Sequence, residues 1–498
     1  MTITADLSGY PLAQETRTYL DAVAFGHVID GELVQSASGA TMPIIEPSTG
    51  TEIGTVASGD AEDLERAVSA ARRSYEDGRW RNLAPLDKER RLRRLSELFA
   101  ANGAVFGDLD TLDAGLLRGY TDAIVQFALA GLDYYAGWPS KITGTIPATG
   151  PDVIVNVTRE PLGVVGIIVP WNGPAFVINF AVAALACGNS VVLKPAEQTP
   201  MSATLMGQLA QEAGIPPGVF NVVHGTGEVI GAGLVAHPHV DAIGFTGSVE
   251  TGRRIQASGA ATLKKVALEL GGKSAHVFFD DCDIEPAAAT AAAAVWGASG
   301  QVCTAGTRVL VQRGIYEEFL VKVKENTESI TIGSPFSPDT GLGPVVSAEQ
   351  LDRVTRYVGI GEAEGAEVFH GGKRHGDQGY FFEPTIFTGV ANSMRIAQEE
   401  IFGPVMVAIP FDTEEEAITI ANDVEYGLAS GVWTNNLSRA HRVSRAINAG
   451  TVWVNTYGEV QMSVPYGGMK QSGHGRSLGE ESINELTQTK SVWMRIAR

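Results

Sequence analysis

Short apolar runs alternate with amphipathic stretches through the middle of the chain. The runs are rich in Val, Ile, Leu and Phe and occupy residues 164–169, 190–193, 220–223, 242–245 and 266–270. The intervals between them carry apolar residues at helical spacing, at 175–186, 202–212 and 248–257. Buried runs that alternate with amphipathic helices are typical of a parallel sheet with crossover helices. The pattern therefore predicts a doubly wound α/β domain, which binds its ligands at the carboxyl ends of the strands.

A second series of elements follows this region. The pattern predicts strands at 308–312, 405–409 and 451–455, and helices at 284–298, 316–329, 351–364, 413–421 and 438–447. Nearer the N-terminus it predicts helices at 61–75 and 87–102, after small strands with a hairpin turn at Asp30-Gly31. Two strand-like segments, 153–158 and 490–496, lie outside both series. Such arms often pair with another subunit, and a surface coil is the alternative.

Composition narrows the class of protein. Of the 498 residues, 44% are hydrophobic and 19% are charged, which makes a globular chain the expectation rather than a disordered one. The formal charge of −20 argues against nucleic-acid binding, which needs a basic surface. The apolar stretch 163–193 is interrupted by prolines and asparagines, and the N-terminus lacks a signal-peptide pattern. We therefore expect no membrane span and a cytoplasmic location.

The 3 cysteines are too few for a disulfide framework and indicate a reducing compartment. Cys303 stands among the small residues of 300–306, where the backbone would let a substrate approach and offer N–H donors to it. Cys187 lies in an apolar helix, and Cys282 lies among three aspartates whose charges raise the pKa of a thiol. The sequence favours Cys303 as a nucleophile, and a buried inert cysteine is the alternative.

Polar residues follow or end several of the predicted strands. Glu269 lies in the last run, where burial raises the pKa of a carboxyl group and suits it as a base; a solvated strand edge is the alternative. Asn172 follows the first run, where an amide can donate to a developing oxyanion or stabilise a turn. Lys194 and Glu197 follow the second run, where an acidic residue can bind ribose hydroxyls.

Two glycine-rich segments resemble nucleotide loops only weakly. The glycines of 225–233 are one residue out of step with the dinucleotide fingerprint, and a turn without a ligand explains them equally well. Gly271-Gly272-Lys273-Ser274 looks like the end of a phosphate-binding loop, but Ala267 stands where that motif needs glycine. The motifs of zinc proteases and of serine hydrolases do not occur, so nothing in the sequence requires a metal.

Seven stretches, in order along the chain, closely resemble the NAD(P)-dependent aldehyde dehydrogenase superfamily. They are Pro170-Trp171-Asn172, Leu193-Lys194-Pro195-Ala196-Glu197, Phe245-Thr246-Gly247-Ser248, Leu268-Glu269-Leu270-Gly271-Gly272-Lys273, Gly300-Gln301-Val302-Cys303, Glu399-Glu400-Ile401-Phe402-Gly403-Pro404 and Tyr466-Gly467-Gly468. The resemblance extends roughly from Ile29 to Val492. Each stretch alone is weak, but seven in this order are specific.

The resemblance implies an α/β fold with two doubly wound parallel-sheet domains and a β-ribbon oligomerisation arm. An NAD-binding domain would span 1–140 and 160–270, and a catalytic domain would span 271–475. The ribbon and tail would span 141–159 and 476–498. The family forms homodimers or homotetramers in which the ribbon extends a neighbour's sheet.

The resemblance also implies the oxidation of an aldehyde to the carboxylic acid. Cys303 would attack the aldehyde, Asn172 and the Cys303 N–H would stabilise the oxyanion, and Glu269 would activate the water that hydrolyses the thioester. We expect NAD rather than NADP, because Glu197 would repel a 2′-phosphate. The implied cofactor-binding residues are Ile168, Pro170, Trp171, Lys194, Glu197, Gly227, Phe245, Gly247, Ser248, Leu270, Gly271, Glu400 and Phe402.

The implied substrate pocket differs from that of relatives at three positions: Gly173 and Gly458 are smaller than the usual residues, and Trp296 is larger. Its residues are Gly173, Val177, Phe180, Trp296, Val302, Thr304, Tyr457, Glu459 and Tyr466, with Thr456 and Gly458 in the same loop as Tyr457. The stretch Tyr134-Tyr135 with Trp138 is similar to betaine- and amino-aldehyde relatives and, with Glu459, suits a cationic aldehyde. An aromatic or aliphatic aldehyde is the alternative.

Three other functions stay open from the sequence alone. A CoA-acylating relative would need no water-activating base, so Glu269 argues against it. A binding protein without activity would not need Cys303, Glu269 and Asn172 together. A P-loop NTPase would need the glycine that is missing at Ala267.

Overall fold

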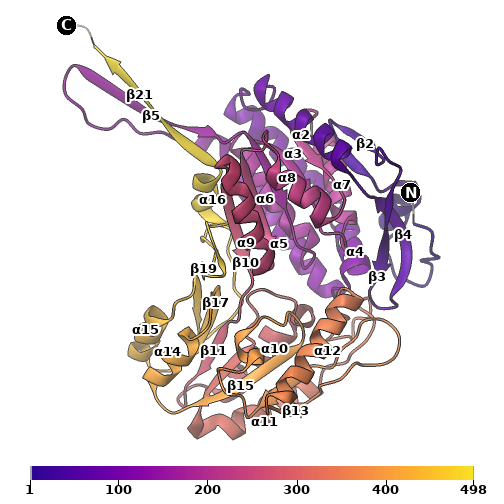
Figure 1. Cartoon of the computed structure of the whole chain (residues 1–498), viewed down its shortest axis with the longest axis vertical. Coiled ribbons are helices and arrows are strands. Elements are labelled where there is room, and N and C mark those ends of the chain that lie inside the picture. The colour runs from indigo at the N-terminus through magenta and orange to yellow at the C-terminus, as the bar shows by residue number, and fades with distance from the viewer. Residues whose placement is uncertain (1–2, 497–498) are drawn as a thin grey trace.

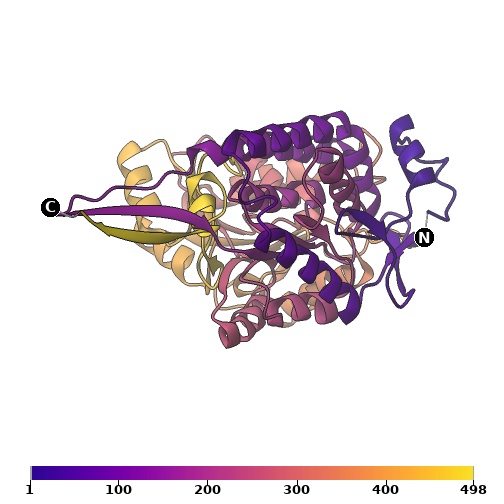
Figure 2. The same cartoon turned by 90° about the horizontal axis from the view of Figure 1, so that it is seen from above.

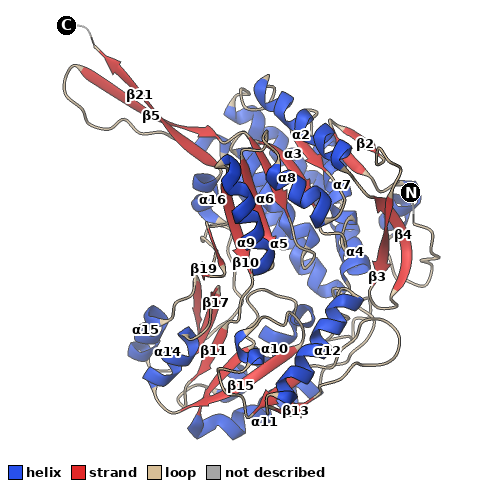
Figure 3. Cartoon of the chain, viewed as in Figure 1, coloured by secondary structure: helices blue, strands red, loops and turns tan. Residues whose placement is uncertain are grey.

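The computed structural model describes residues 3–496, apart from the side chains of 177–179. Two large sheets, each flanked by helices, form the two lobes of the molecule (Figures 1 and 3). A two-stranded ribbon projects away from the first lobe and carries the C-terminal end of the chain. None of the helices in residues 3–496 combines the length and the hydropathy needed to cross a bilayer.

The first sheet has the strand order β2-β1-β8-β7-β6-β9-β10-β20 within the described residues. Its centre consists of five parallel strands: β6 (Val164–Ile168), β7 (Ser190–Lys194), β8 (Phe220–Val222), β9 (Ala242–Gly247) and β10 (Lys265–Leu270). The prediction that the five apolar runs form a parallel sheet is confirmed. Antiparallel strands extend it at both edges: β1 (His27–Ile29), β2 (Glu32–Val34) and β20 (Gly473–His474). Asp30 and Gly31 join β1 to β2 and both have positive φ, which confirms the predicted tight hairpin.

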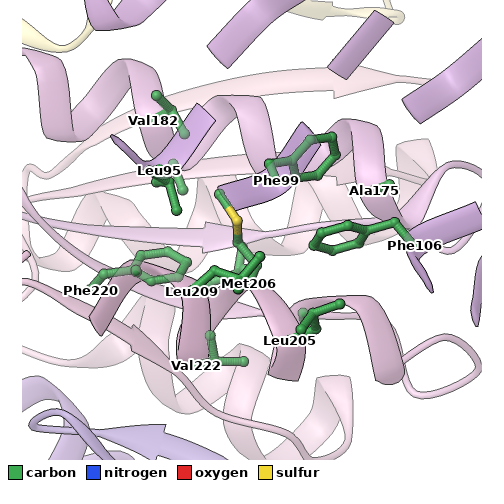
Figure 4. Close-up of a cluster of buried hydrophobic side chains, with 14 of the residues drawn as sticks. Leu95, Phe99, Phe106, Ala175, Val182, Leu205, Met206, Leu209, Phe220 and Val222 are labelled. Atoms are coloured by element: carbon green, nitrogen blue, oxygen red, sulfur yellow. The ribbon is translucent and has the colours of Figure 1, made fainter. Parts of the chain in front are cut away.

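Helices cover both faces of the first sheet. Apolar side chains of one face share a core with α2 (Ala61–Glu76), α8 (Ala232–Ala236) and α9 (Val249–Gly259). The opposite face packs against α3 (Pro85–Ala101), α4 (Gly103–Ala114), α5 (Arg118–Ala136), α6 (Pro174–Ala186) and α7 (Met201–Glu212). Figure 4 shows this second core, in which Phe99, Phe106, Val182 and Met206 gather over Phe220 and Val222 of β8. The apolar face of each helix fixes which side of the sheet it covers.

The second sheet has the order β13-β14-β15-β12-β11-β17-β18 within the described residues. Its strands are β11 (Ala275–Phe278), β12 (Arg308–Gln312), β13 (Glu367–His370), β14 (Thr385–Thr388), β15 (Val405–Phe411), β17 (Ala429–Trp433) and β18 (Thr451–Val454). All neighbours are parallel except β13 and β14. The flanking helices are α10 (Ile284–Trp296), α11 (Tyr316–Glu328), α12 (Ala348–Ala363), α13 (Arg395–Gln398), α14 (Glu414–Asn422) and α15 (Leu437–Ala446).

The two predicted arms pair with each other. β5 (Val153–Pro161) and β21 (Thr487–Arg495) form an antiparallel ribbon, in register from Thr487 opposite Pro161 to Arg495 opposite Val153 (Figure 2). The prediction of strands there is confirmed, and the surface coil is wrong. Smaller elements complete the chain: α1 (Gln14–Ala22), the hairpin of β3 (Thr41–Glu46) and β4 (Thr51–Ala57), the pair of β16 (Tyr426–Gly427) and β19 (Met469–Lys470), and α16 (Gly479–Glu485).

Candidate active site

The predicted site residues gather where the two lobes meet. Strands β6, β7, β9 and β10 all point their carboxyl ends toward the second lobe, and the chain crosses from β10 to β11 through Gly271 and Gly272. A close approach favours glycine at 272, because a Cβ there would meet the backbone carbonyl oxygen of Cys303 at 2.5 Å. The expected ligand-binding edge of the first sheet therefore faces the loops of the second sheet.

Cys303 follows a strained turn after α10. Ala298 and Ser299 both have positive φ, and a Cβ on Gly300 would collide with the Gly403 carbonyl. Non-glycine residues adopt this backbone only where surrounding structure enforces it, and such strain concentrates at functional sites. The loop is held from the other side by Gln301, whose Oε1 accepts a hydrogen bond from the Val346 N–H at 2.9 Å.

The Cys303 thiol is half-buried and has one hydroxyl neighbour among the described residues. Its sulfur lies 3.4 Å from the Tyr466 Oη. Burial raises the pKa of Cys303 to about 11, and the hydrogen bond from Tyr466 opposes that increase. Burial raises the pKa of Cys187 to about 12, and burial with the charge of Asp281 raises that of Cys282 to about 11. Cys303 alone of the three is only half-buried, so it is the thiol that a substrate can reach.

Asn172 connects the first sheet to the cysteine loop. Its Nδ2 donates a hydrogen bond to the Gln301 carbonyl at 2.8 Å, two residues before Cys303. The side chain reaches this position because α6 begins at Pro174 with Gly173 as its N-cap. The second N–H of the amide remains available for a substrate oxygen. This hydrogen bond places the predicted oxyanion donor beside the predicted nucleophile.

Glu269 lies on β10 in an unusual environment for a carboxylate. Its Oε1 accepts a hydrogen bond from Ser477 Oγ at 2.8 Å, and its Oε2 has no hydrogen-bond partner among the described residues. Burial raises the pKa of Glu269 to about 8, and the hydrogen bond from Ser477 and the charge of Arg476 oppose the rise. A carboxyl group with this pKa exchanges protons near neutral pH, as a general base must.

A cavity of about 80 Å³ lies behind Glu269. It runs over one face of β6, β9 and β10, beneath α6 and α16, to Lys265 and Glu485, which form an ion pair at 3.2 Å. Small residues create the space: Gly244 and Ala267 line it, and a Cβ added to Gly244 would meet no atom within 4 Å. A water needs roughly 10–15 Å³ of such space, so the cavity has room for several.

Lys194 is the last residue of β7, and Glu197 is the third residue after the strand. Lys194 is buried, donates to the Pro195 carbonyl at 2.7 Å and lies 3.6 Å from Glu197 Oε1. The same Glu197 oxygen accepts a hydrogen bond from the Gly227 N–H, so the glycine-rich segment 225–233 is tied to this carboxylate. Nearby, Ser248 caps α9, and its Oγ accepts from the Thr251 N–H at 3.2 Å. A helix start beside a carboxylate offers places for a phosphate and a ribose.

Glu400 and Phe402 enter the site from the second lobe. Glu400 Oε1 accepts a hydrogen bond from the Gly272 N–H at 3.0 Å, and burial raises the pKa of this carboxyl group to about 7. Phe402 has positive φ, and its ring meets Trp171 edge-on at 5.2 Å between centroids. Lys273, the lysine of the phosphate-loop lookalike, is buried, and its Nζ has no hydrogen-bond partner among the described residues.

The remaining predicted cofactor residues are spread over the strand ends. Ile168, Phe245 and Leu270 are buried in the core shared with α9. Gly247 lies against the Phe245 ring, which a Cβ would meet at 2.5 Å. Pro170 is half-buried directly after β6. These residues form the floor of the region that Glu197, Ser248 and Glu400 surround.

Apolar and aromatic side chains line the approach to the cysteine loop. Val302 of this loop and Tyr120 and Ile124 of α5 pack against one small cluster of buried residues, Ala114, Leu116 and Ala298. A Cβ on Gly173 would come within 3.9 Å of Ile124. The Thr304 carbonyl accepts a hydrogen bond from Tyr457 Oη at 2.6 Å. Tyr120 and Ile124 have no signal in the sequence, because only the packing of α5 brings them here.

Trp296 does not belong to this wall. Its side chain is buried between α10 and α11, where Nε1 donates to Thr327 Oγ1 at 3.1 Å. The pocket prediction is corrected at this position, because α10 ends at Trp296 and turns the indole into the core. Phe180 lines the cavity behind Glu269 instead, and the Val177 side chain lies outside the described part of the structure.

The aromatic stretch at 134–138 packs within the first lobe, and Glu459 lies at the surface. Tyr135 is buried and donates to Ser482 Oγ at 3.0 Å, while Tyr134 and Trp138 pack edge-on at 5.9 Å. These rings are packing residues of the first lobe. Glu459 is exposed, and its Oε1 accepts from Thr456 Oγ1 at 2.7 Å. Within residues 3–496, apart from the side chains of 177–179, no group of His, Cys, Asp and Glu is placed to hold a metal ion.

Comparison with known proteins gives consistent results. A sequence model of the aldehyde dehydrogenase family matches residues 33–492. The chain is 44% identical over 473 residues to an aldehyde dehydrogenase of Davidiella tassiana, which covers 95% of both chains. It is 42% identical over 475 residues to retinal dehydrogenase 2 of Homo sapiens, which covers 94% of this chain and 91% of the relative.

Solved structures agree with these sequence relatives. An indole-3-acetaldehyde dehydrogenase in complex with NAD+ is similar with a TM-score of 0.94 and 42% identity, over 97% of this chain and 98% of that one. An NAD+ complex of an aldehyde dehydrogenase from Bacillus cereus is similar with a TM-score of 0.96 and 39% identity, over 98% and 100% of the two chains.

Proposed function

Because the chain belongs to the aldehyde dehydrogenase family and is an enzyme that oxidises aldehydes, we propose that Cys303, Asn172 and Glu269 carry out this reaction with NAD as the oxidant. The observation that carries the proposal is the hydrogen bond from Asn172 Nδ2 to the Gln301 carbonyl. It brings an amide from the first sheet to the loop of the half-buried thiol, which is the arrangement that attack on a carbonyl requires.

The first step is attack by the Cys303 thiolate on the aldehyde carbon. The free N–H of Asn172 and the backbone N–H of Cys303 then donate to the oxygen on which negative charge develops. Tyr466 supports the thiolate: its own pKa is raised well above 10 by burial and by Cys303, so its hydroxyl stays protonated and can donate to the sulfur. When bound, the nicotinamide cofactor supplies the hydride acceptor, and Cys303 is left as a thioester.

Hydrolysis of the thioester is the task of Glu269. Its unpartnered Oε2 and raised pKa suit it to take a proton from water. The cavity beside it is mostly apolar, and it offers polar groups to a water at Glu269, Arg476 and Ser477. This favours release of the free acid over transfer of the acyl group to CoA, which needs no such base.

The residues at the strand ends fit a dinucleotide. Glu197 presents a carboxylate at the end of β7, the start of α9 offers unpaired N–H groups near Ser248, and the carboxylate of Glu400 stands over Gly271. Glu197 and Lys194 would hold the adenosine ribose, Ser248 the pyrophosphate, and Glu400 with Phe402 the nicotinamide ribose. We favour NAD over NADP because Glu197 would repel a 2′-phosphate.

The wall of the approach supports an uncharged aromatic or aliphatic aldehyde as the substrate. Tyr120, Ile124 and Val302 are apolar or aromatic, and the rings that suggested a cationic substrate are packing residues instead. Glu459 is exposed and already hydrogen-bonded to Thr456. Among the described side chains, Tyr120, Ile124 and Val302 offer no carboxylate to a cationic aldehyde, and it stays the second candidate.

We also propose the division of the chain into an NAD-binding domain of 1–140 and 160–270, a catalytic domain of 271–475, and a ribbon with its tail at 141–159 and 476–498. The ribbon supports a homodimer or homotetramer, since it projects from the body and exposes Trp493 at 69% of its surface. A cytoplasmic location is proposed because Cys303 must stay reduced.

An aldehyde panel tests the proposed function. Wild type is mixed with aromatic, aliphatic and cationic aldehydes, each with NAD and with NADP, and reduced cofactor and free acid are measured. We expect reduced cofactor and acid in equal amounts, most with NAD and the uncharged aldehydes, and none with Cys303→Ala, which should still bind NAD. Substantial turnover by Cys303→Ala, or a requirement for CoA, would refute the proposal.

A further inference from the structure

Helix α4 carries three buried aspartates that hold the first turns of other helices. Asp108 Oδ2 accepts hydrogen bonds from the Ala13 N–H at 2.8 Å and from Thr16 Oγ1 at 2.6 Å, at the start of α1. Asp113 Oδ2 accepts from the Met201 N–H at 3.2 Å, at the first residue of α7. The first N–H groups of a helix lack partners within it, and these carboxylates supply the acceptors.

Asp110 joins two helices at once. Its Oδ2 accepts a hydrogen bond from the Ala175 N–H at 2.9 Å, in the first turn of α6. Its Oδ1 accepts from Ser202 Oγ at 2.5 Å, in the first turn of α7. Asp110, Asp113 and Ser202 are all at most 1% exposed, so these hydrogen bonds do not compete with bulk water. The starts of α6 and α7 are thereby fixed to one turn of α4.

The loops that lead into α6 and α7 each carry a residue of the proposed active site. Asn172 lies two residues before α6, and its amide reaches the cysteine loop through the Gln301 carbonyl. Glu197 lies in the loop between β7 and α7, four residues before Met201. A shift of either helix would move the oxyanion donor or the ribose-binding carboxylate, because short backbone links leave little freedom between them.

Two buried carboxylates this close are unfavourable if both are charged. Asp110 and Asp113 are three residues apart on one helix and therefore neighbours on its surface. No ion pair within residues 3–496 joins either of them to a Lys, Arg or His. Burial raises the pKa of Asp110 to about 7, and burial with the charge of Asp110 raises that of Asp113 well above its usual value.

We propose that Asp110 and Asp113 are positioning residues, the first ionised and the second protonated, that lock the starts of α6 and α7, and thus Asn172 and Glu197, in one arrangement. The inference rests on the functions proposed above for Asn172 and Glu197. Asp110 is the ionised member, because both of its oxygens accept hydrogen bonds. Asp113 holds the proton, on the Oδ1 that has no partner among the described residues.

Three asparagine variants on the same helix separate positioning from plain stability. Asp110→Asn keeps one acceptor oxygen for the Ala175 N–H, removes the negative charge, and forces the Ser202 hydroxyl to accept a hydrogen bond where it now donates one. We expect kcat/KM for the aldehyde to fall about tenfold and the Kd for NAD to rise several-fold. Asp113→Asn imitates the neutral acid, so both constants should stay within about twofold of wild type.

Asp108→Asn is the matched control. It is equally buried but holds α1 and, through an ion pair with Arg118 at 2.8 Å, the start of α5. Neither helix carries a residue proposed to bind NAD, so the variant should lower Tm without moving the Kd for NAD. Its kcat/KM is not used as a control, because α5 carries Tyr120 and Ile124. Ser202→Ala removes only the hydroxyl that Asp110 accepts from and provides a milder variant if Asp110→Asn does not fold. It should weaken NAD binding in the same direction.

The outcomes distinguish the two proposals. If the soluble Asp110 or Ser202 variant loses Tm only and keeps the wild-type kcat/KM and Kd for NAD, the positioning role is refuted. If Asp113→Asn is as damaging to kcat/KM as Asp110→Asn, the protonated state of Asp113 is refuted. If wild type itself oxidises no aldehyde, the proposed function fails before the variants are compared.

Discussion

Glu269 is the residue whose chemistry depends most on its surroundings. Burial raises its pKa to about 8, well above that of an exposed glutamate. A general base acts only in its deprotonated form, so the hydrolysis step should speed up as pH rises through about 8 and level off above it. The profile of kcat against pH, taken with an aldehyde whose hydrolysis limits turnover, measures this. A flat profile from about pH 6 to 9 would contradict the assignment.

Tyr466 is the one hydroxyl within hydrogen-bonding distance of the Cys303 sulfur among the described residues. Tyr466→Phe removes a donor to a charged sulfur, a loss of about 1.5–3 kcal/mol for such bonds. We expect acylation to slow at least about tenfold and the alkylation of Cys303 by iodoacetamide to shift to higher pH. Tyr135→Phe, which removes a buried hydroxyl bonded to Ser482, is the control and should leave that alkylation profile in place.

The cavity behind Glu269 is a property of three strands and two helices rather than of one residue. Gly244 on β9 lines the cavity, and a Cβ there would meet no atom within 4 Å, so the methyl group of Gly244→Ala fits and Gly244→Val extends two carbons further. Gly244→Val should slow hydrolysis several-fold while the initial burst of NADH keeps its rate, and Gly244→Ala should do so less. Steady-state kinetics of both variants measure the hydrolysis rate, and stopped-flow kinetics measure the NADH burst. A normal kcat in a well-folded Gly244→Val enzyme would show that water reaches Glu269 by another route.

Helices and strands with a clear pattern of apolar residues were predictable from the sequence. Those that depend on tertiary contacts were not. The strand at 308–312 coincides with β12, and the five runs of the first sheet lie within a residue or two of their strands. β11 and β17 are short and contain His276, Ser430 and Gly431, so no apolar run marks them. α1 was missed because its sequence is polar and only Thr16 and Leu20 are buried.

The same division holds for the site. Cys303, Asn172 and Glu269 stand beside turns and strand ends that the sequence marks, and the structure brings Asn172 to the cysteine loop. Ser477 lies 208 residues from Glu269 along the chain, so no local pattern could pair them. The position of Trp296 depended on where α10 ends, and helix ends are set by packing more than by propensity.

The ribbon is the feature of the whole molecule that indicates association with another subunit. Val492, Met494 and Ile154 are exposed on one face of it and Trp493 on the other, and a monomer would leave all of these apolar side chains in water. Trp493→Glu should shift the enzyme from a homo-oligomer toward monomers, as measured by light scattering after size exclusion. Gln488→Glu adds the same charge to the exposed part of the same strand and should not. A monomeric wild type would contradict the proposed assembly.

The central claim is that Cys303 becomes acylated and that Glu269 releases the acid. The most direct measurement is a single turnover of Glu269→Gln with aldehyde and NAD, followed by stopped-flow detection of NADH and by intact-mass and peptide analysis of the protein. We predict a burst of about one NADH per active site, stalled turnover, and an acyl group on Cys303. NADH formed without an acyl group on Cys303, or steady turnover equal to wild type, would contradict the account.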